Sequence, residues 1–183
     1  MVSLVVFGGI KRIGKVASKM VPAMVVIYVV SVVYILMVHM DVLGEYLILI
    51  VTDAFTANSV MGGAVGALII TGVRRAAFSN EAGIGTATLA HGAAKTKEPV
   101  REGLVAMMGP FIDTLVVCTM TALAILVTGV WTSGDVNGIS LTASAFQKAM
   151  GPIGGYVLML CVLIFAFSSL FTYSYYSTKC LGF

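Results

Sequence analysis

The segment Ala149–Thr178, AMGPIGGYVLMLCVLIFAFSSLFTYSYYST, decides the fold because it contains no Asp, Glu, Lys or Arg. A helix that crosses a bilayer needs about 20 largely apolar residues. Three more stretches have this character: Met20–Met40, Ala54–Val73 and Gly103–Gly134, the last interrupted only by Asp113. Their apolar residues run continuously and do not alternate, so we predict four transmembrane helices and not a barrel.

The composition independently indicates an integral membrane protein. The chain has 183 residues, of which 59% are hydrophobic and 10% charged, against about 25% charged residues in ordinary soluble domains. This excludes disordered, coiled-coil and nucleic-acid-binding proteins, which need more charge, and argues against a soluble enzyme. The cysteines Cys118, Cys161 and Cys180 have no CxxC spacing and are interpreted as ordinary thiols.

The first residues, 1–10, are apolar but too short to span a membrane. Basic residues follow them, which is the reverse of the order in a signal peptide. We interpret this segment as the inner end of a truncated helix, and we therefore expect the chain to be a fragment of a longer protein.

The basic residues predict the orientation of the helices. Ten of the eleven lie in alternate connections, and only Lys148 departs; the ten are Lys11, Arg12, Lys15, Lys19, Arg74, Arg75, Lys95, Lys97, Arg101 and Lys179. Because cytoplasmic loops are enriched in Lys and Arg, the N-terminal basic segment is predicted to lie inside. The later connections then lie outside, inside, outside and inside in turn.

The connections carry their own patterns. Residues 42–55 are expected to form a short interfacial helix on the outer side, and residues 79–102 a cytoplasmic loop. Residues 130–151 form an outer connection in which Leu141–Met150 looks amphipathic. This last segment is either a lid over an outer vestibule or a plain extracellular loop, and both interpretations remain open.

Glycines make the second span unusual, because Gly62, Gly63 and Gly66 fall near its middle. Glycine permits non-helical backbone and the close approach of a ligand. In many secondary transporters a helix breaks near the midplane, where its free backbone groups bind substrate and ions. The alternative is close helix packing through small residues such as Gly62 and Gly66.

The fourth span contains the run Phe165-Ala166-Phe167-Ser168-Ser169. The hydroxyls of Ser168 and Ser169, with a backbone carbonyl, are hard oxygen ligands of the kind that alkali cations use. The alternative is that both hydroxyls donate to carbonyls one turn earlier in the helix.

Other polar residues give weaker signals. Asp113 is a functional candidate as an intramembrane carboxylate, or it is solvated near the inner interface or paired with Arg101. His39 and His91 lie in connections on opposite sides, so a shared metal site is not expected. The chain has no P-loop, GxSxG or HExxH motif and no complete dinucleotide-binding loop, so we do not expect an enzyme.

Longer motifs resemble one transporter family. Residues 75–87, RAAFSNEAGIGTA, are similar to the RGxFSNEAGxGSAP signature of the alanine or glycine:cation symporters, also called sodium:alanine symporters. The likeness continues through 90–96, 99–103, 111–114 and 118–119. It also includes GGIKRI at 8–13, FAFSS at 165–169 and YSYY at 173–176. These elements occur in family order over nearly the whole chain.

The resemblance implies a fold and a layout. Members have the LeuT-type inverted-repeat fold, so this all-α membrane chain would hold four full transmembrane helices and one truncated helix. Residues 1–10 would end the fourth core helix, and 20–39 would be the fifth. The broken sixth would be 57–78, the seventh 103–129 and the eighth 152–173, followed by a cytoplasmic end at 174–183.

The resemblance also implies a function and sites. Members are secondary transporters of the plasma membrane, here the bacterial inner membrane, that import alanine or glycine with Na⁺ and sometimes H⁺. The substrate would bind at Gly62, Gly63, Ala64, Val65 and Gly66, and sodium at Phe165, Ser168 and Ser169. Partners would be the amino acid, the lipid bilayer and the missing remainder of the transporter chain, with no nucleic acid.

Departures from the family pattern bear on selectivity. Ala64 stands where many members have Phe, Ala76 replaces a Gly and Ser169 replaces a Thr while retaining the hydroxyl. Because the first helix, which supplies the opposite wall of both sites, is absent, we expect the chain alone not to transport. The rival hypothesis is a non-transporting membrane scaffold or a channel, which would need a polar stripe lining a pore or a filter motif.

Overall fold

The computed structural model describes residues 9–56, 64–81, 83–133 and 138–182. Within these ranges all regular secondary structure is helical, as expected for an all-α protein. The chain divides into two compact units, one formed by residues 1–38 with 128–183 and the other by residues 39–127.

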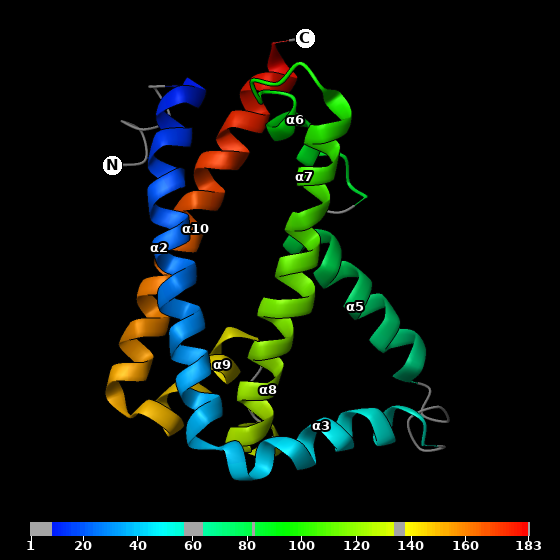
Figure 1. The fold of residues 1–183 in the computed structure, drawn as a ribbon, viewed down its shortest axis with the longest axis vertical. Helices are drawn as coiled ribbons and strands as arrows, with labels where there is room; N and C mark the ends of the chain where they lie inside the picture. The colour runs from blue at the N-terminus through cyan, green and yellow to red at the C-terminus, as the bar shows by residue number, and fades with distance from the viewer. Residues whose placement is uncertain (1–8, 57–63, 82, 134–137, 183) are drawn as a thin grey trace. The chain divides into compact units, whose positions relative to one another are not determined.

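Two long helices form the frame of the first unit. Helix α2 (Gly9–Val38) and helix α10 (Pro152–Leu181) pack along each other, and the short helix α9 (Ile139–Met150) packs against both (Figure 1). A 3₁₀ turn, η2 (Val130–Ser133), precedes α9. The basic segment 11–19, expected as a connection between an inner helix end and the first span, is instead part of α2. Lys, Arg and Ala are good helix formers, so one helix continues through the segment.

The core of the first unit lies where these helices meet. Val32 and Ile35 of α2 and Phe146 of α9 are fully buried. The Phe146 ring stacks on Tyr28 with centroids 5.8 Å apart, and the thiol of Cys161 lies 3.9 Å from the Met24 carbonyl oxygen. Aromatic packing of this kind stabilises the contact beyond the area it buries.

A glycine corner turns α9 into α10. Gly151 has a φ of +67°, a left-handed conformation that glycine adopts without a steric penalty, and Pro152 then occupies the first helical position. A Cβ on Gly154 would lie only 2.2 Å from the Phe146 carbonyl oxygen. The corner therefore depends on a small residue at position 154.

The second unit contains shorter helices. They are α3 (Met40–Ala54), α5 (Ala64–Asn80), α6 (Ala87–His91), α7 (Pro99–Phe111), the π-helix η1 (Ile112–Cys118) and α8 (Thr119–Thr128), whose last residue belongs to the first unit. Helices α7, η1 and α8 follow one another without a connection, and α5 packs against η1.

The π-helix has a cause in the sequence. Pro110 lies inside α7, where it lacks an amide hydrogen and its ring clashes with the carbonyl four residues earlier. A helix accommodates such a defect by a kink or by a wider turn. Here η1 begins at Ile112 and extends the wider hydrogen-bond pattern to Cys118, which changes where Asp113 and its neighbours lie on the helix surface.

Within the described ranges, three helical segments are long and apolar enough to cross a membrane: Ile13–Val38, Pro99–Thr128 and Pro152–Leu181. Large apolar side chains remain exposed along them, among them Val30 at 62% and Leu115 at 59%. Exposed apolar surface on this scale is what a bilayer covers. The remaining expected span, 57–78, falls partly on residues 57–63, outside the described residues.

Candidate functional site

The glycine-rich segment proposed for substrate lies at the start of α5. Gly62 and Gly63 fall outside the described residues, whereas Ala64, Val65 and Gly66 belong to the first turn described for this helix. Gly66 is exposed, and a Cβ built there meets no other described atom within 4 Å. In the described part of the second unit, therefore, no neighbouring helix packs closely onto Gly66.

The residues proposed for sodium lie on α10, in the first unit. Ser168 Oγ donates a hydrogen bond to the Phe165 carbonyl oxygen, 2.8 Å away, and Thr172 Oγ1 donates to the Ser168 carbonyl oxygen over 2.9 Å. Back-bonding, the alternative raised by the sequence, is thus observed for Ser168. This bond also brings the Ser168 hydroxyl oxygen and the Phe165 carbonyl oxygen together on one side of the helix.

A polar cluster joins the end of α5 to the π-helix. Ser79 Oγ donates to Asp113 Oδ2 over 2.6 Å, and Asn80 Nδ2 donates to Thr114 Oγ1 over 2.5 Å. Two consecutive residues of α5 therefore bond to two consecutive residues of η1. The sequence left open that Asp113 pairs with Arg101. Among the described residues, Asp113 forms no ion pair with Arg101 or with any other basic side chain.

The backbone is strained where this cluster ends. Glu81, the residue after α5, has a φ of +54° and is the one non-glycine residue with positive φ in the described ranges. Such a conformation costs about 1–3 kcal/mol and persists only where the surroundings impose it. Thr86 Oγ1 donates to Glu81 Oε2 over 2.8 Å, and this bond helps to hold the turn.

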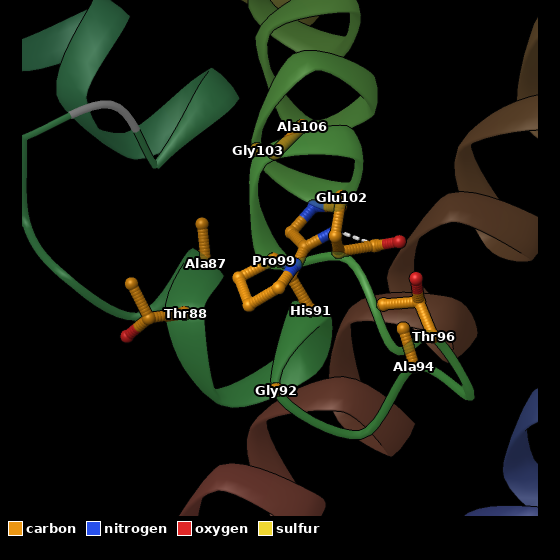
Figure 2. A pocket seen from close by; sticks show the side chains of 10 residues that line it. All are labelled: Ala87, Thr88, His91, Gly92, Ala94, Thr96, Pro99, Glu102, Gly103 and Ala106. Carbon is orange, nitrogen blue, oxygen red and sulfur yellow. Dashed lines mark hydrogen bonds and ion pairs between the residues drawn. The ribbon is translucent and has the colours of Figure 1, made fainter.

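A cavity of about 440 Å³ lies between α6 and the start of α7. Figure 2 shows His91 and Glu102 facing each other at this cavity, and the two atoms His91 Nδ1 and Glu102 Oε1 are 2.7 Å apart. Glu102 also lies in the first turn of α7, where a negative charge stabilises the helix. The pair fixes α6 against α7, and the cavity includes none of the residues proposed for substrate or sodium.

The partners of Asp113 do not follow from the sequence pattern. Asp113 stands out as an intramembrane carboxylate, but nothing in the sequence connects Ser79 or Thr114 with it. The signal available was Pro110, because a proline inside a helix marks a local irregularity. In the described residues, no three His, Cys, Asp or Glu side chains gather as a metal site.

Comparison with known proteins decides the family. The family model described as the sodium:alanine symporter family matches residues 1–183, the whole chain. This chain belongs to the sodium:alanine symporter family.

Three relatives illustrate the range of this family. The sodium/alanine symporter AgcS of Methanococcus maripaludis is 40% identical over 96% of this chain and 39% of its own length. The probable sodium/glutamine symporter GlnT of Bacillus subtilis is 37% identical over 98% of the chain and 37% of its own. The sodium/proton-dependent alanine carrier protein of Bacillus sp. PS3 is 32% identical over 93% and 41%.

The sodium:alanine symporter family and these relatives are transporters and not enzymes. Together with the three segments able to cross a membrane, the family makes this chain part of a multi-pass protein of the cell membrane. The chain spans about 40% of the length of the relatives that it matches.

Proposed function

We propose that the full-length protein containing this chain is a sodium-coupled symporter that imports small neutral amino acids, alanine or glycine, by alternating access. The observation that carries the proposal is the family match over residues 1–183, which is supported by a sodium/alanine symporter 40% identical over nearly the whole chain. The LeuT-type fold, with the helix order given by the family resemblance, is part of the same proposal.

The substrate segment would act through its backbone. A helix that begins within the glycine run directs unpaired amide hydrogens at its N-terminal end, where the helix dipole is positive. These groups suit the carboxylate of an amino acid, as in other transporters with broken helices. The segment Gly62–Gly66 contains only Gly, Ala and Val, and its glycines allow a ligand to approach the backbone closely.

Selectivity within the family bears on this assignment. Relatives of similar identity are named for alanine and for glutamine. Ala64 stands where many members carry Phe, and the smaller side chain leaves more room in the pocket. We place alanine and glycine first, and a glutamine preference would be seen directly as competition in the uptake assay described below.

Sodium would bind at α10 and supply the driving force. The Phe165 carbonyl oxygen and the Ser168 hydroxyl are already neighbours, and the Ser169 hydroxyl lies on the next residue. Oxygen ligands of this kind suit Na⁺, and the names of two relatives include protons beside sodium. An ion that enters down the membrane potential releases about 2.3 kcal/mol per charge per 100 mV, which is available to drive the amino acid inward.

The test is uptake by the full-length protein in proteoliposomes. Labelled alanine and glycine should accumulate with saturation when an inward sodium gradient is imposed and not when choline replaces sodium. Unlabelled glutamine serves as a competitor. Uptake that ignores sodium or fails to saturate contradicts the symporter and favours a channel. The same assay on the 183-residue chain tests the expectation that it does not transport alone.

A further inference from the structure

The cluster that joins α5 to the π-helix contains an excess of hydrogen-bond acceptors. Its four residues, Ser79, Asn80, Asp113 and Thr114, offer carboxylate, amide and hydroxyl oxygens. Among the described residues, the only basic and acidic side chains within 4 Å of each other are those of His91 and Glu102. The Asp113 carboxylate is therefore not balanced by a described basic side chain.

One of these oxygens is buried without a donor. In the part of the chain that the structure describes, Asn80 Oδ1 is the one buried side-chain polar atom that has no hydrogen-bond partner. A buried acceptor without a partner costs about 1–3 kcal/mol, and each such group in a native structure calls for an explanation. A bound cation would give this oxygen a partner.

The position of the cluster in the chain also favours a bound cation. Asp113 lies near the middle of the membrane-competent segment Pro99–Thr128, where an unbalanced carboxylate is costly. Ser79 and Asn80 are the last residues of α5, and a helix C-terminus presents free carbonyl oxygens and the negative end of the helix dipole. The ends of half-helices coordinate ions in this way in other transporters.

The π-helix η1 contributes Asp113 and Thr114, the other two residues of the cluster. Short π-helical segments inside α-helices occur frequently at functional sites. In η1 the wider turn spans Asp113 and Thr114, the two residues that accept hydrogen bonds from Ser79 and Asn80. The left-handed Glu81 follows the α5 residues of the cluster directly, so α5 ends at the cluster.

We propose that Ser79, Asn80, Asp113 and Thr114 form a sodium-ion site between the end of α5 and the π-helix, separate from the site at α10. The identity of the ion rests on the proposed function. A proton would satisfy only one oxygen and leave Asn80 Oδ1 without a partner. A divalent cation would leave net positive charge in an apolar segment that contributes a single carboxylate, whereas Na⁺ balances the charge and accepts several oxygens.

The experiment measures sodium alone, without amino acid. Full-length protein in nanodiscs is titrated with ²²Na⁺ in choline chloride, and the number of sodium equivalents and their affinities are determined. Asp113→Asn should bind one sodium ion fewer per protein molecule. Ser79→Ala, which retains the Asp113 carboxylate, should lower the affinity for that sodium ion about tenfold. Asp41→Asn, an exposed carboxylate on α3, is the matched control and should bind sodium as the original protein does.

The outcomes separate this proposal from the proposed function. If Asp113→Asn and Ser79→Ala both bind sodium with unchanged number and affinity, the site is refuted even if uptake is sodium-coupled. If Asp113→Asn alters only the pH dependence of uptake, the ligand is a proton and the sodium site is also refuted. If amino-acid uptake does not depend on sodium but the protein still binds a sodium ion that requires Asp113, the site is supported and the symport proposal is refuted. Should Asp113→Asn not fold, Ser79→Ala decides the matter.

Discussion

At the scale of single residues, a substitution at Gly63 gives the most direct test of the proposed substrate site. A Leu side chain there would fill the space in which a small amino acid is proposed to bind backbone groups. We expect Gly63→Leu to abolish alanine uptake, by at least about a hundredfold, while membrane insertion is retained. Uptake and the amount of protein in the membrane are measured together.

A matched control exists for this substitution. Gly44 lies on α3, where a Cβ meets no described atom within 4 Å and φ is not positive. Gly44→Leu should therefore retain uptake. Wild-type uptake by Gly63→Leu would reject the substrate assignment, and equal loss in both variants would show a general effect of bulk.

Ser168 tests the sodium site on α10. Removing its hydroxyl takes away a proposed ligand, so Ser168→Ala should raise the sodium concentration for half-maximal uptake about tenfold, which corresponds to about 1.4 kcal/mol. Ser174 on the same helix makes the same kind of back-bond, from Oγ to the Leu170 carbonyl oxygen over 2.7 Å. Ser174→Ala should leave the sodium dependence unchanged, and a similar shift in both variants would mean that back-bonding alone explains the effect.

At the scale of structural elements, the corner between α9 and α10 makes a prediction about stability. Gly154→Ala places a Cβ against the Phe146 backbone, and backbone cannot yield as a side chain can. We expect the substitution to destabilise the protein by about 1–3 kcal/mol, which is measured as a lower melting temperature of the full-length protein in detergent.

The neighbouring glycine provides the comparison. A Cβ on Gly155 would lie 2.8 Å from Gln147 Nε2, the end of a flexible side chain that can move away. Gly155→Ala should therefore cost less than Gly154→Ala. Equal melting temperatures for the two variants would contradict the packing described at this corner.

Long apolar runs in the sequence predict helices more reliably than they predict where those helices begin or how they are distorted. The expected helices at 20–39 and 152–173 correspond to parts of α2 and α10, because long apolar runs have few alternatives in lipid. The N-terminal part of α2, which includes 11–19, was not foreseen, because the charges there mark a boundary of polarity but do not stop a helix. The π-helix was not foreseen either, because its hydrogen bonds depend on how the chain relaxes after Pro110.

At the scale of the whole molecule, the distribution of basic residues predicts which connections face the cytoplasm. After Cys118, Cys161 and Cys180 are replaced by Ser, a cysteine at Lys97 should react with an impermeant maleimide only from the cytoplasmic side. A cysteine at Ser140 should react only from outside. Labelling is measured on intact cells and on inverted vesicles of the full-length protein, and labelling of both positions from the same side would contradict the predicted topology.

The sequence by itself determined the class of the protein and its family. Continuous apolar runs, few charges and the RAAFSNEAGIGTA motif indicate a membrane transporter, since each of these properties resides in the chain and needs no contact to exist. The tertiary structure alone places Asp113 against Ser79 and Thr114 against Asn80. The physical reason is that a hydrogen bond depends on distance and direction, and for residues 34 positions apart these follow from how two helices pack.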